Sequence, residues 1–475
     1  MSNKLWIIDT DPIQDMDDTL AIIAVIQLFL ARRAVGEDLD LCFISANEVP
    51  EKKRAKFIMA IIQTFSQLNE VNVFAGLETK KIDEAENPLV MPRMEPYILK
   101  DSNPNTAKIK NINDFFPFVS NHIANGGTVN YVCIAPMSNL EHLIRKLQDN
   151  NLSTQLSQIE LTLLAGKMSP RQPCGKIKFS SDPQIISKME LATKLDHKPA
   201  LVTYDNTFYF VGYDVNPDVL KLNLDSDSET IMKELFPESP DTLVPIEADD
   251  FNKVRSATSY TPIASEHNVT EDTKAAEKVF RSLNLFKNHR IIPATNAEYE
   301  PLSIIPKHPL FDWLDTADAT GTLSAMAFVN LDNFLESIGK TYGYESCKPF
   351  DVLAVFAALF PNVQLFDYTS GLVRMNLDGE IDPYSGMNTD LDNKHYSVSM
   401  NYATRITSSV KFWEMLKKVY LLNTVSLQDK TDFLHAQDKP LSLSSAAGTF
   451  FGTEIASEKT SINIVNPLSN CDKTI

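Results

Sequence analysis

The first two hundred residues alternate between short apolar runs and longer segments in which apolar residues recur at helical spacing. The short runs are typical of strands buried on both faces, and the longer segments of amphipathic helices. The expected strands are 5–8, 39–45, 71–76, 129–134, 159–165 and 200–204. The expected helices are 19–32, 52–68, 112–124, 140–148 and 182–194. This alternation predicts an α/β fold with a doubly wound, mostly parallel sheet.

The alternation weakens over about 211–340, where Pro, Asp, Ser and Asn interrupt the apolar runs. We expect this range to be a large divergent insertion or subdomain within one domain that covers 1–422. Regular patterns then return, with helices expected at 348–360 and 410–422 and strands at 363–367, 372–377 and 396–402. The remainder, 423–475, is rich in Ser, Thr, Asp and Asn, and we expect a polar, loosely ordered C-terminal tail or an interaction segment.

Composition narrows the class of protein. The chain has 475 residues, 43% of them hydrophobic, which is enough for a substantial core, and its formal net charge is −18. Such an acidic surface repels nucleic acid polymers and anionic membranes, so we expect neither as a partner. Five cysteines without CxxC spacing, no signal sequence and no apolar stretch long enough to cross a bilayer predict a cytoplasmic or otherwise intracellular protein.

The most informative segment follows the first expected strand, where Asp9, Asp11, Asp15, Asp17 and Asp18 fall within ten residues. Carboxylates gathered at one strand end repel one another, and a hard cation such as Ca²⁺ would offset that cost. Asp17 and Asp18 could also be stabilised by the positive end of the following helix. The alternative interpretation is a helix N-terminus with spare, solvated acids.

The segment DTDPIQDMDD resembles the DTDPGxDD signature of the inosine-uridine-preferring nucleoside hydrolases, as a divergent member. Eight further segments resemble motifs of that family in the same chain order. They are SAN at 45–47, VFAG at 73–76, APMSNL at 135–140, LAG at 164–166, FSSDP at 179–183, YDNT at 204–207, KPFDVLAV at 348–355 and TSGL at 369–372. The resemblance implies a nucleoside-hydrolase-like fold and a Ca²⁺-dependent N-glycosidase site.

The resemblance also implies a role for each site residue. Asp11 would bind the metal and act as general base on its water, while Asp18, the Ser138 carbonyl and Asp351 would complete the protein ligands. Two further residues, Asp17 and Asn47, would hydrogen-bond the ribose hydroxyls, and Asp9 would support the loop.

Three departures from the family pattern affect these expectations. The loop at 13–16 is two residues longer and lacks the family's Gly, so Asp15 becomes an additional candidate ligand. Phe350 stands where the family often has a His that protonates the leaving base; it cannot donate a proton but could stack on the base. Lys176 and Lys178 replace the pair that grips the 5′-hydroxyl. Either they form an ordinary solvated loop, or they accept a 5′-phosphate.

These observations predict a Ca²⁺-dependent hydrolase of the ribosyl C–N bond in a small nucleoside-like substrate, which could carry a 5′-phosphate. Two alternatives remain. One is a metal-retaining ribosyl-binding protein with weak or no catalysis, and the other is an interaction or effector protein built on this scaffold. A homo-oligomer is compatible with the sequence but not indicated by it.

Overall fold

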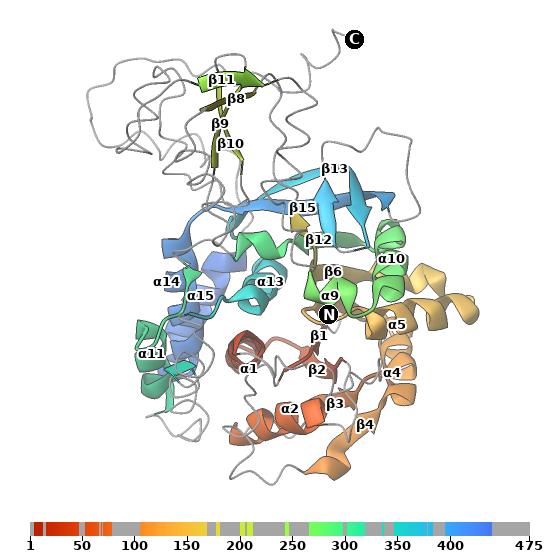
Figure 1. The fold of residues 1–475 in the computed structure, drawn as a ribbon. Helices are drawn as coiled ribbons and strands as arrows, with labels where there is room; N and C mark the ends of the chain where they lie inside the picture. The colour runs from red at the N-terminus through yellow and green to blue at the C-terminus, as the bar shows by residue number, and fades with distance from the viewer. Residues whose placement is uncertain are drawn as a thin grey trace.

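The structure is a computed structural model. It describes residues 4–12, 16–46, 53–65, 68, 70–77, 105–168, 177–180, 200–204, 207–211, 243–246, 266–297, 302–318, 335–336, 346–377, 379–382 and 395–438. In this part of the chain, an 11-stranded sheet carries the fold, with helices on both faces (Figure 1). The expected α/β class with a mostly parallel sheet is confirmed.

The first strand lies inside the sheet. β1 (Lys4–Thr10) is parallel to β2 (Leu39–Ser45) on one side and to β5 (Thr128–Cys133) on the other. Beyond β2 follow β3 (Asn72–Ala75) and β4 (Ile109–Asn111). Beyond β5 follow β6 (Ile159–Leu164), β12 (Asn288–Ile292) and β15 (His395–Ile406). The strand order reverses between β1 and β5, which is where ligands bind in open α/β sheets.

The far edge of this sheet is antiparallel. β13 (Phe366–Asn376) pairs with β15 along most of its length, and β14 (Glu380–Asp382) and β7 (Lys167–Met168) follow it. The two strands expected at 363–367 and 372–377 are therefore one strand.

The strand expected at 200–204 exists as β9 (Ala200–Tyr204), but its predicted place in the parallel sheet is wrong. It belongs to a separate antiparallel sheet with β8 (Ile177–Ser180), β10 (Thr207–Val211) and β11 (Leu243–Ile246). Tyr204 of β9 pairs with Thr207 of β10, so only two residues connect these strands. Such a short connection forms an antiparallel hairpin, because a parallel pair needs a crossover of about a dozen residues or more.

Two hydrophobic clusters lie on opposite faces of the sheet. One is built with α1 (Asp17–Ala34), α2 (Lys53–Thr64), α11 (Pro309–Asp318), α13 (Phe350–Leu359) and α14 (Ser409–Leu421). The other is built with α4 (Ile112–Ala124), α5 (Ser138–Asp149), α9 (His267–Thr270) and α10 (Thr273–Arg281). Figure 1 shows α1 and α13 next to each other on one side, and α4 and α5 on the other.

Helix α1 is central to the first cluster because its apolar residues cover nearly its whole circumference, and almost all of them are buried. It packs against α13 and α14. The Tyr420 hydroxyl of α14 donates a hydrogen bond to the Leu20 carbonyl at 3.0 Å. These contacts set the position of the first turn of α1, which carries Asp17 and Asp18.

The ranges 211–340 and 423–475 contain elements of the main fold. β12 lies between β6 and β15, so this part of the expected insertion belongs to the central sheet. Within the expected polar tail, α15 (Leu427–Asp438) is well formed, and its Asp438 makes an ion pair with Arg32 of α1 at 2.9 Å. The expected helix at 182–194 and the tail beyond 438 lie outside the described residues.

Short 3-10 helices lie at Thr106–Lys108, Ser153–Gln158, Leu283–Leu285, Ala294–Asn296 and Leu422–Thr424.

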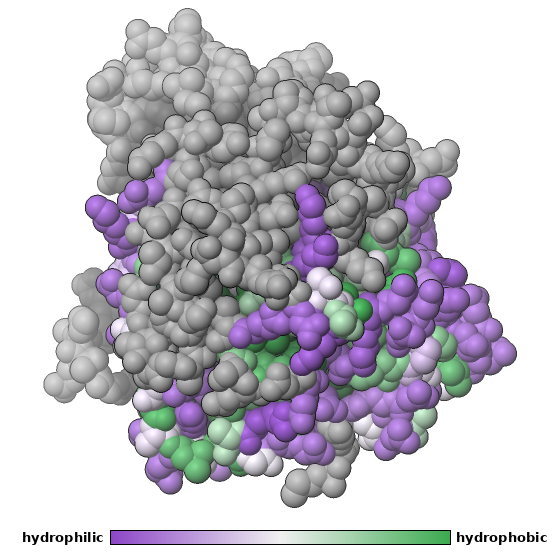
Figure 2. Space-filling model, turned by 90° about the horizontal axis from the view of Figure 1, so that it is seen from below, coloured by the Kyte–Doolittle hydropathy of each residue, from purple (hydrophilic) through white to green (hydrophobic). Residues whose placement is uncertain are grey.

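None of the helices in the described part of the chain combines the length and apolar character that a bilayer span requires. Hydrophilic residues prevail among the described residues on the face in Figure 2, where hydrophobic ones form small separate groups. Of the cysteines that the structure describes, Cys42 and Cys133 are buried and form no disulfide.

Candidate functional site

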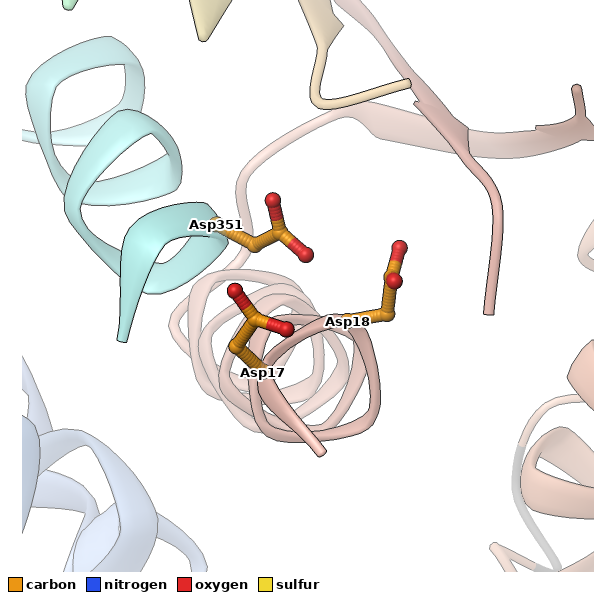
Figure 3. Close-up of side chains that lie close together, drawn as sticks. All are labelled: Asp17, Asp18 and Asp351. Carbon is orange, nitrogen blue, oxygen red and sulfur yellow. The ribbon is translucent and has the colours of Figure 1, made fainter. Parts of the chain in front are cut away.

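Three buried carboxylates meet beside the carboxyl end of β1. Asp17 and Asp18 lie in the first turn of α1, and Asp351 lies in the first turn of α13. One carboxylate oxygen from each lies within 4.8 Å of the others. The residues are only 3%, 4% and 4% exposed, respectively. Figure 3 shows the three side chains directed toward a common space between the two helices.

The charge in this group favours a cation. The N-terminal ends of α1 and α13 each supply roughly +0.5 of partial charge, or about +1 together. Three ionised carboxylates would carry three negative charges, which leaves about two negative charges that the helix ends do not balance. Oxygen donors of this kind are the ligands that Ca²⁺ and other hard divalent cations prefer. The donor set therefore fits the metal that the sequence resemblance implies.

The strand end orients Asp18. Its Oδ1 accepts a hydrogen bond from the Thr10 hydroxyl and another, 3.1 Å long, from the backbone N–H of Asp11. Both donors belong to the segment that leaves β1, so the sheet itself positions this carboxylate. Such bracing limits the rearrangement that ligand binding would require.

Asp11 has a different environment. Its side chain is almost buried, and its Oδ2 lies 3.7 Å from Nη1 of Arg54, a residue of α2. The same Nη1 donates to the Ala46 carbonyl at 2.7 Å, just beyond β2. Among the described residues, the close carboxylate group contains Asp17 and does not contain Asp11. Sequence reasoning missed Arg54, whose only signal was a basic run at the start of an expected helix.

Asp9 is completely buried beneath the strand ends. It accepts hydrogen bonds from the Tyr131 hydroxyl at 2.8 Å and from Nδ2 of Asn139 at 2.9 Å. Burial raises the pKa of Asp9 to about 7, although the hydrogen bonds from Asn139 and Tyr131 act in the opposite direction. Asp9 thus ties β1 to β5 and to the first turn of α5.

Asn139 connects three strand ends and was not predicted as a site residue. Besides Asp9, its Nδ2 reaches the Ser45 carbonyl at 3.2 Å, and its Oδ1 accepts the backbone N–H of Leu77 at 2.8 Å. Gly76 passes so close that an added Cβ would lie 2.1 Å from the Ser45 carbonyl and 2.5 Å from the Asn139 amide. Asn139 and Gly76 both lie within segments that resemble family motifs, and this position in the motifs was the only sequence signal for their role.

Ser138 begins α5 at the carboxyl end of β5. Its hydroxyl donates to Asp272 at 2.8 Å, and Asp272 in turn caps α10 by accepting the N–H of Ala275 at 3.1 Å. A segment that the sequence suggested to be an insertion is thereby anchored to a predicted site residue. The metal-binding role of the Ser138 carbonyl stays a prediction.

The remaining predicted site residues are Phe350, Lys178, Asp15, Asn47 and Lys176. Phe350 begins α13, is partly buried and packs against the hydrophobic cluster. Lys178 lies in β8 of the smaller sheet. Asp15, Asn47 and Lys176 lie outside the described residues.

No family model and no curated protein matches this chain. Among solved structures, the effector protein XOO4466 aligns with a TM-score of 0.50 at 12% identity, over 90% of this chain and 95% of that one. A plant nucleoside hydrolase aligns with a TM-score of 0.49 at 14% identity, over 88% of this chain and 99% of that one. The inosine-uridine-preferring nucleoside hydrolase from Bacillus anthracis aligns with a TM-score of 0.44 at 10% identity, over 88% of this chain and 99% of that one. The XOO4466 alignment indicates a shared overall fold.

Proposed function

We propose that this protein is a Ca²⁺-dependent hydrolase of the N-glycosidic bond of a small nucleoside-like molecule. The observation that supports it best is the meeting of Asp17, Asp18 and Asp351 at the point where the strand order reverses. The sequence resemblance assigns a metal-binding role to Asp11, Asp18 and Asp351, and two of these, Asp18 and Asp351, belong to the close group. Asp17 is close enough to be a further ligand or to hydrogen-bond a sugar hydroxyl.

The residues suit the chemistry of this bond. Cleavage of a ribosyl C–N bond passes through an oxocarbenium-like state, whose positive charge buried carboxylates stabilise. When bound, the cation would hold the sugar diol and lower the pKa of a water molecule. Asp18 and Asp351, with the Ser138 carbonyl, would hold the cation, and Asp11 would accept the proton from the attacking water.

The leaving group is the less conventional part of the proposal. Phe350 has no proton to deliver, so the substrate would carry a base that departs without protonation. Lys176 and Lys178 would favour an anionic 5′ group such as a phosphate. The proposed substrate is therefore a nucleoside 5′-monophosphate with a good leaving base.

The activity can be tested with p-nitrophenyl riboside, whose leaving group needs no acid. Release of p-nitrophenolate that is abolished by EDTA and restored by Ca²⁺ is the expected result. Lack of turnover of both p-nitrophenyl riboside and a nucleoside 5′-monophosphate at saturating Ca²⁺ would contradict the proposal. A parallel comparison of a nucleoside with its 5′-monophosphate tests the anionic subsite, and equal or better use of the free nucleoside would exclude it.

A second candidate is a ribosyl-binding or effector protein that retains the cation without hydrolysis. The ion-pair distance between Arg54 and Asp11 favours it, because an arginine beside a carboxylate weakens that carboxylate as a base. The alignment with an effector protein is compatible with the same reading. Calorimetric binding of ribose or a nucleoside, dependent on Ca²⁺ and without product formation, would favour this candidate over the enzyme.

A further inference from the structure

We infer that Arg54 is a positioning residue that keeps the Asp11 carboxylate out of the cation's ligand set. The inference rests on the proposed cation site but not on hydrolysis. It concerns the one basic side chain that an ion-pair distance links to the aspartate motif among the described residues.

The geometry of Arg54 supports this role. Its side chain is 6% exposed, and Nη1 is held by the Ala46 carbonyl at 2.7 Å while it faces Asp11 Oδ2 at 3.7 Å. Ala46 is itself fixed to the end of β1, since its N–H donates to the Thr10 carbonyl at 2.8 Å. The guanidinium is thus anchored on two neighbouring strand ends, and its charge draws the carboxylate of Asp11 toward α2.

The backbone and side chain of Asp11 then serve different purposes. Its backbone N–H donates a hydrogen bond to Asp18 Oδ1 at 3.1 Å, whereas its carboxylate lies at ion-pair distance from Arg54. The close group that remains consists of Asp17, Asp18 and Asp351. Direct ligation of a divalent cation would lower the basicity of this carboxylate more than the arginine at 3.7 Å does, so Asp11 held by Arg54 would be the better proton acceptor.

Replacing the arginine should therefore change two measurements in opposite directions. In Arg54→Met, Asp11 is released to join the cation and a repelling positive charge is lost. Ca²⁺ should bind about tenfold more tightly or better by isothermal titration calorimetry. The turnover number for p-nitrophenyl riboside should fall while KM changes little. Arg54→Lys keeps the charge and should restore both values most of the way.

A double-mutant cycle identifies Asp11 as the cause. Asp11→Asn alone should leave Ca²⁺ affinity within about twofold, and Asp11→Asn combined with Arg54→Met should remove the part of the gain that comes from Asp11 as a ligand, leaving only the smaller gain from the lost positive charge. Arg32→Met is the matched control, because it removes another buried, acid-paired arginine from outside the cluster and should not alter Ca²⁺ affinity.

Equal or weaker Ca²⁺ binding by folded Arg54→Met, or a large loss in Asp11→Asn, would overturn the inference. A wild-type protein that does not bind Ca²⁺ would overturn it together with the proposed site. Ca²⁺ binding without hydrolysis would reject the proposed activity, while the affinity measurements would still decide the role of Arg54.

Discussion

Asp351 contributes the one carboxylate of the close group that lies outside the N-terminal motif. It is almost completely buried, and it shares its space with Asp17 and Asp18. In the absence of a cation, three ionised groups at this spacing repel one another through a medium that screens poorly. We therefore expect the cation-free site to lower the stability of the fold and a bound cation to recover that loss.

Asp351→Asn should separate these two effects. Removal of one charge should stabilise the cation-free protein by about 1 kcal/mol and weaken Ca²⁺ binding by at least about tenfold. Thermal unfolding in EDTA and in saturating Ca²⁺ measures both. Asp114→Asn is the control, since Asp114 is an exposed acid in the first turn of α4. A Ca²⁺-induced rise in Tm that matches that of the wild type would contradict the assigned role of Asp351.

The site residues differ in whether the sequence alone could predict them. Asp17, Asp18 and Asp351 could be chosen in advance because acids at helix starts in family-like motifs carry a local signal. Arg54 could not, because a basic run before a helix usually faces solvent and nothing local indicates that it turns inward. Tyr131 could not be predicted either. Its hydroxyl can donate a hydrogen bond to Asp9 only because β5 lies beside β1, which the local sequence does not reveal.

At the scale of elements, the ends of β1, β2 and β3 are held together by one amide side chain and one glycine. Gly76 follows β3 and lies against Asn139 and the Ser45 carbonyl, with no room for a side chain. Here the glycine is required by close approach rather than by backbone conformation.

Gly76→Ala should consequently destabilise the protein. The added methyl group must displace either a backbone carbonyl or the amide that bonds Asp9, which should cost about 1–3 kcal/mol. Urea unfolding followed by circular dichroism measures the change. Gly371→Ala in β13 is the matched control, because nothing lies within 4 Å of the position of its added Cβ. Equal effects of the two substitutions would show that the close packing at Gly76 is not the cause.

Elements were predictable where local periodicity decided them. The helix expected at 112–124 matches α4, and the strand expected at 39–45 matches β2. The partnership of β9 was not predictable in the same way, because an apolar five-residue run does not specify whether its neighbour is parallel or antiparallel. That choice depends on the segment that follows, where β10 begins almost at once.

At the scale of the whole molecule, α15 shows that the packed part of the chain continues beyond residue 422. The sequence suggested a polar tail after 422, since the segment is rich in charged and polar residues. The structure buries Leu434 of α15 and pairs the last residue of this helix, Asp438, with Arg32. Two neighbouring apolar side chains, Leu434 and Phe433, and the ion pair with a buried arginine hold a helix whose composition is otherwise that of a linker.

Leu434→Ala should destabilise the entire domain by about 2–4 kcal/mol, since it leaves a cavity beneath α15. Leu427→Ala in the same helix should have little effect, because Leu427 is 58% exposed. Differential scanning calorimetry should show one transition that shifts as a whole for Leu434→Ala. A small early transition with an unchanged main peak would mean that α15 unfolds separately.

The position of β1 inside the sheet and the burial of α1 beneath α13 and α14 also impose an order on biosynthesis. Helix α1 is among the most apolar helices, yet α13 and α14, which cover it, come much later in the sequence. Long-range closure of this kind is slow, so we expect α1 to stay partly uncovered until these helices have been made. Pulse-labelled hydrogen exchange during refolding should show α1 gaining protection together with α13 and not before it. The three carboxylates would then meet only once α13 has packed against α1, so the cation site would be among the last parts of the molecule to form.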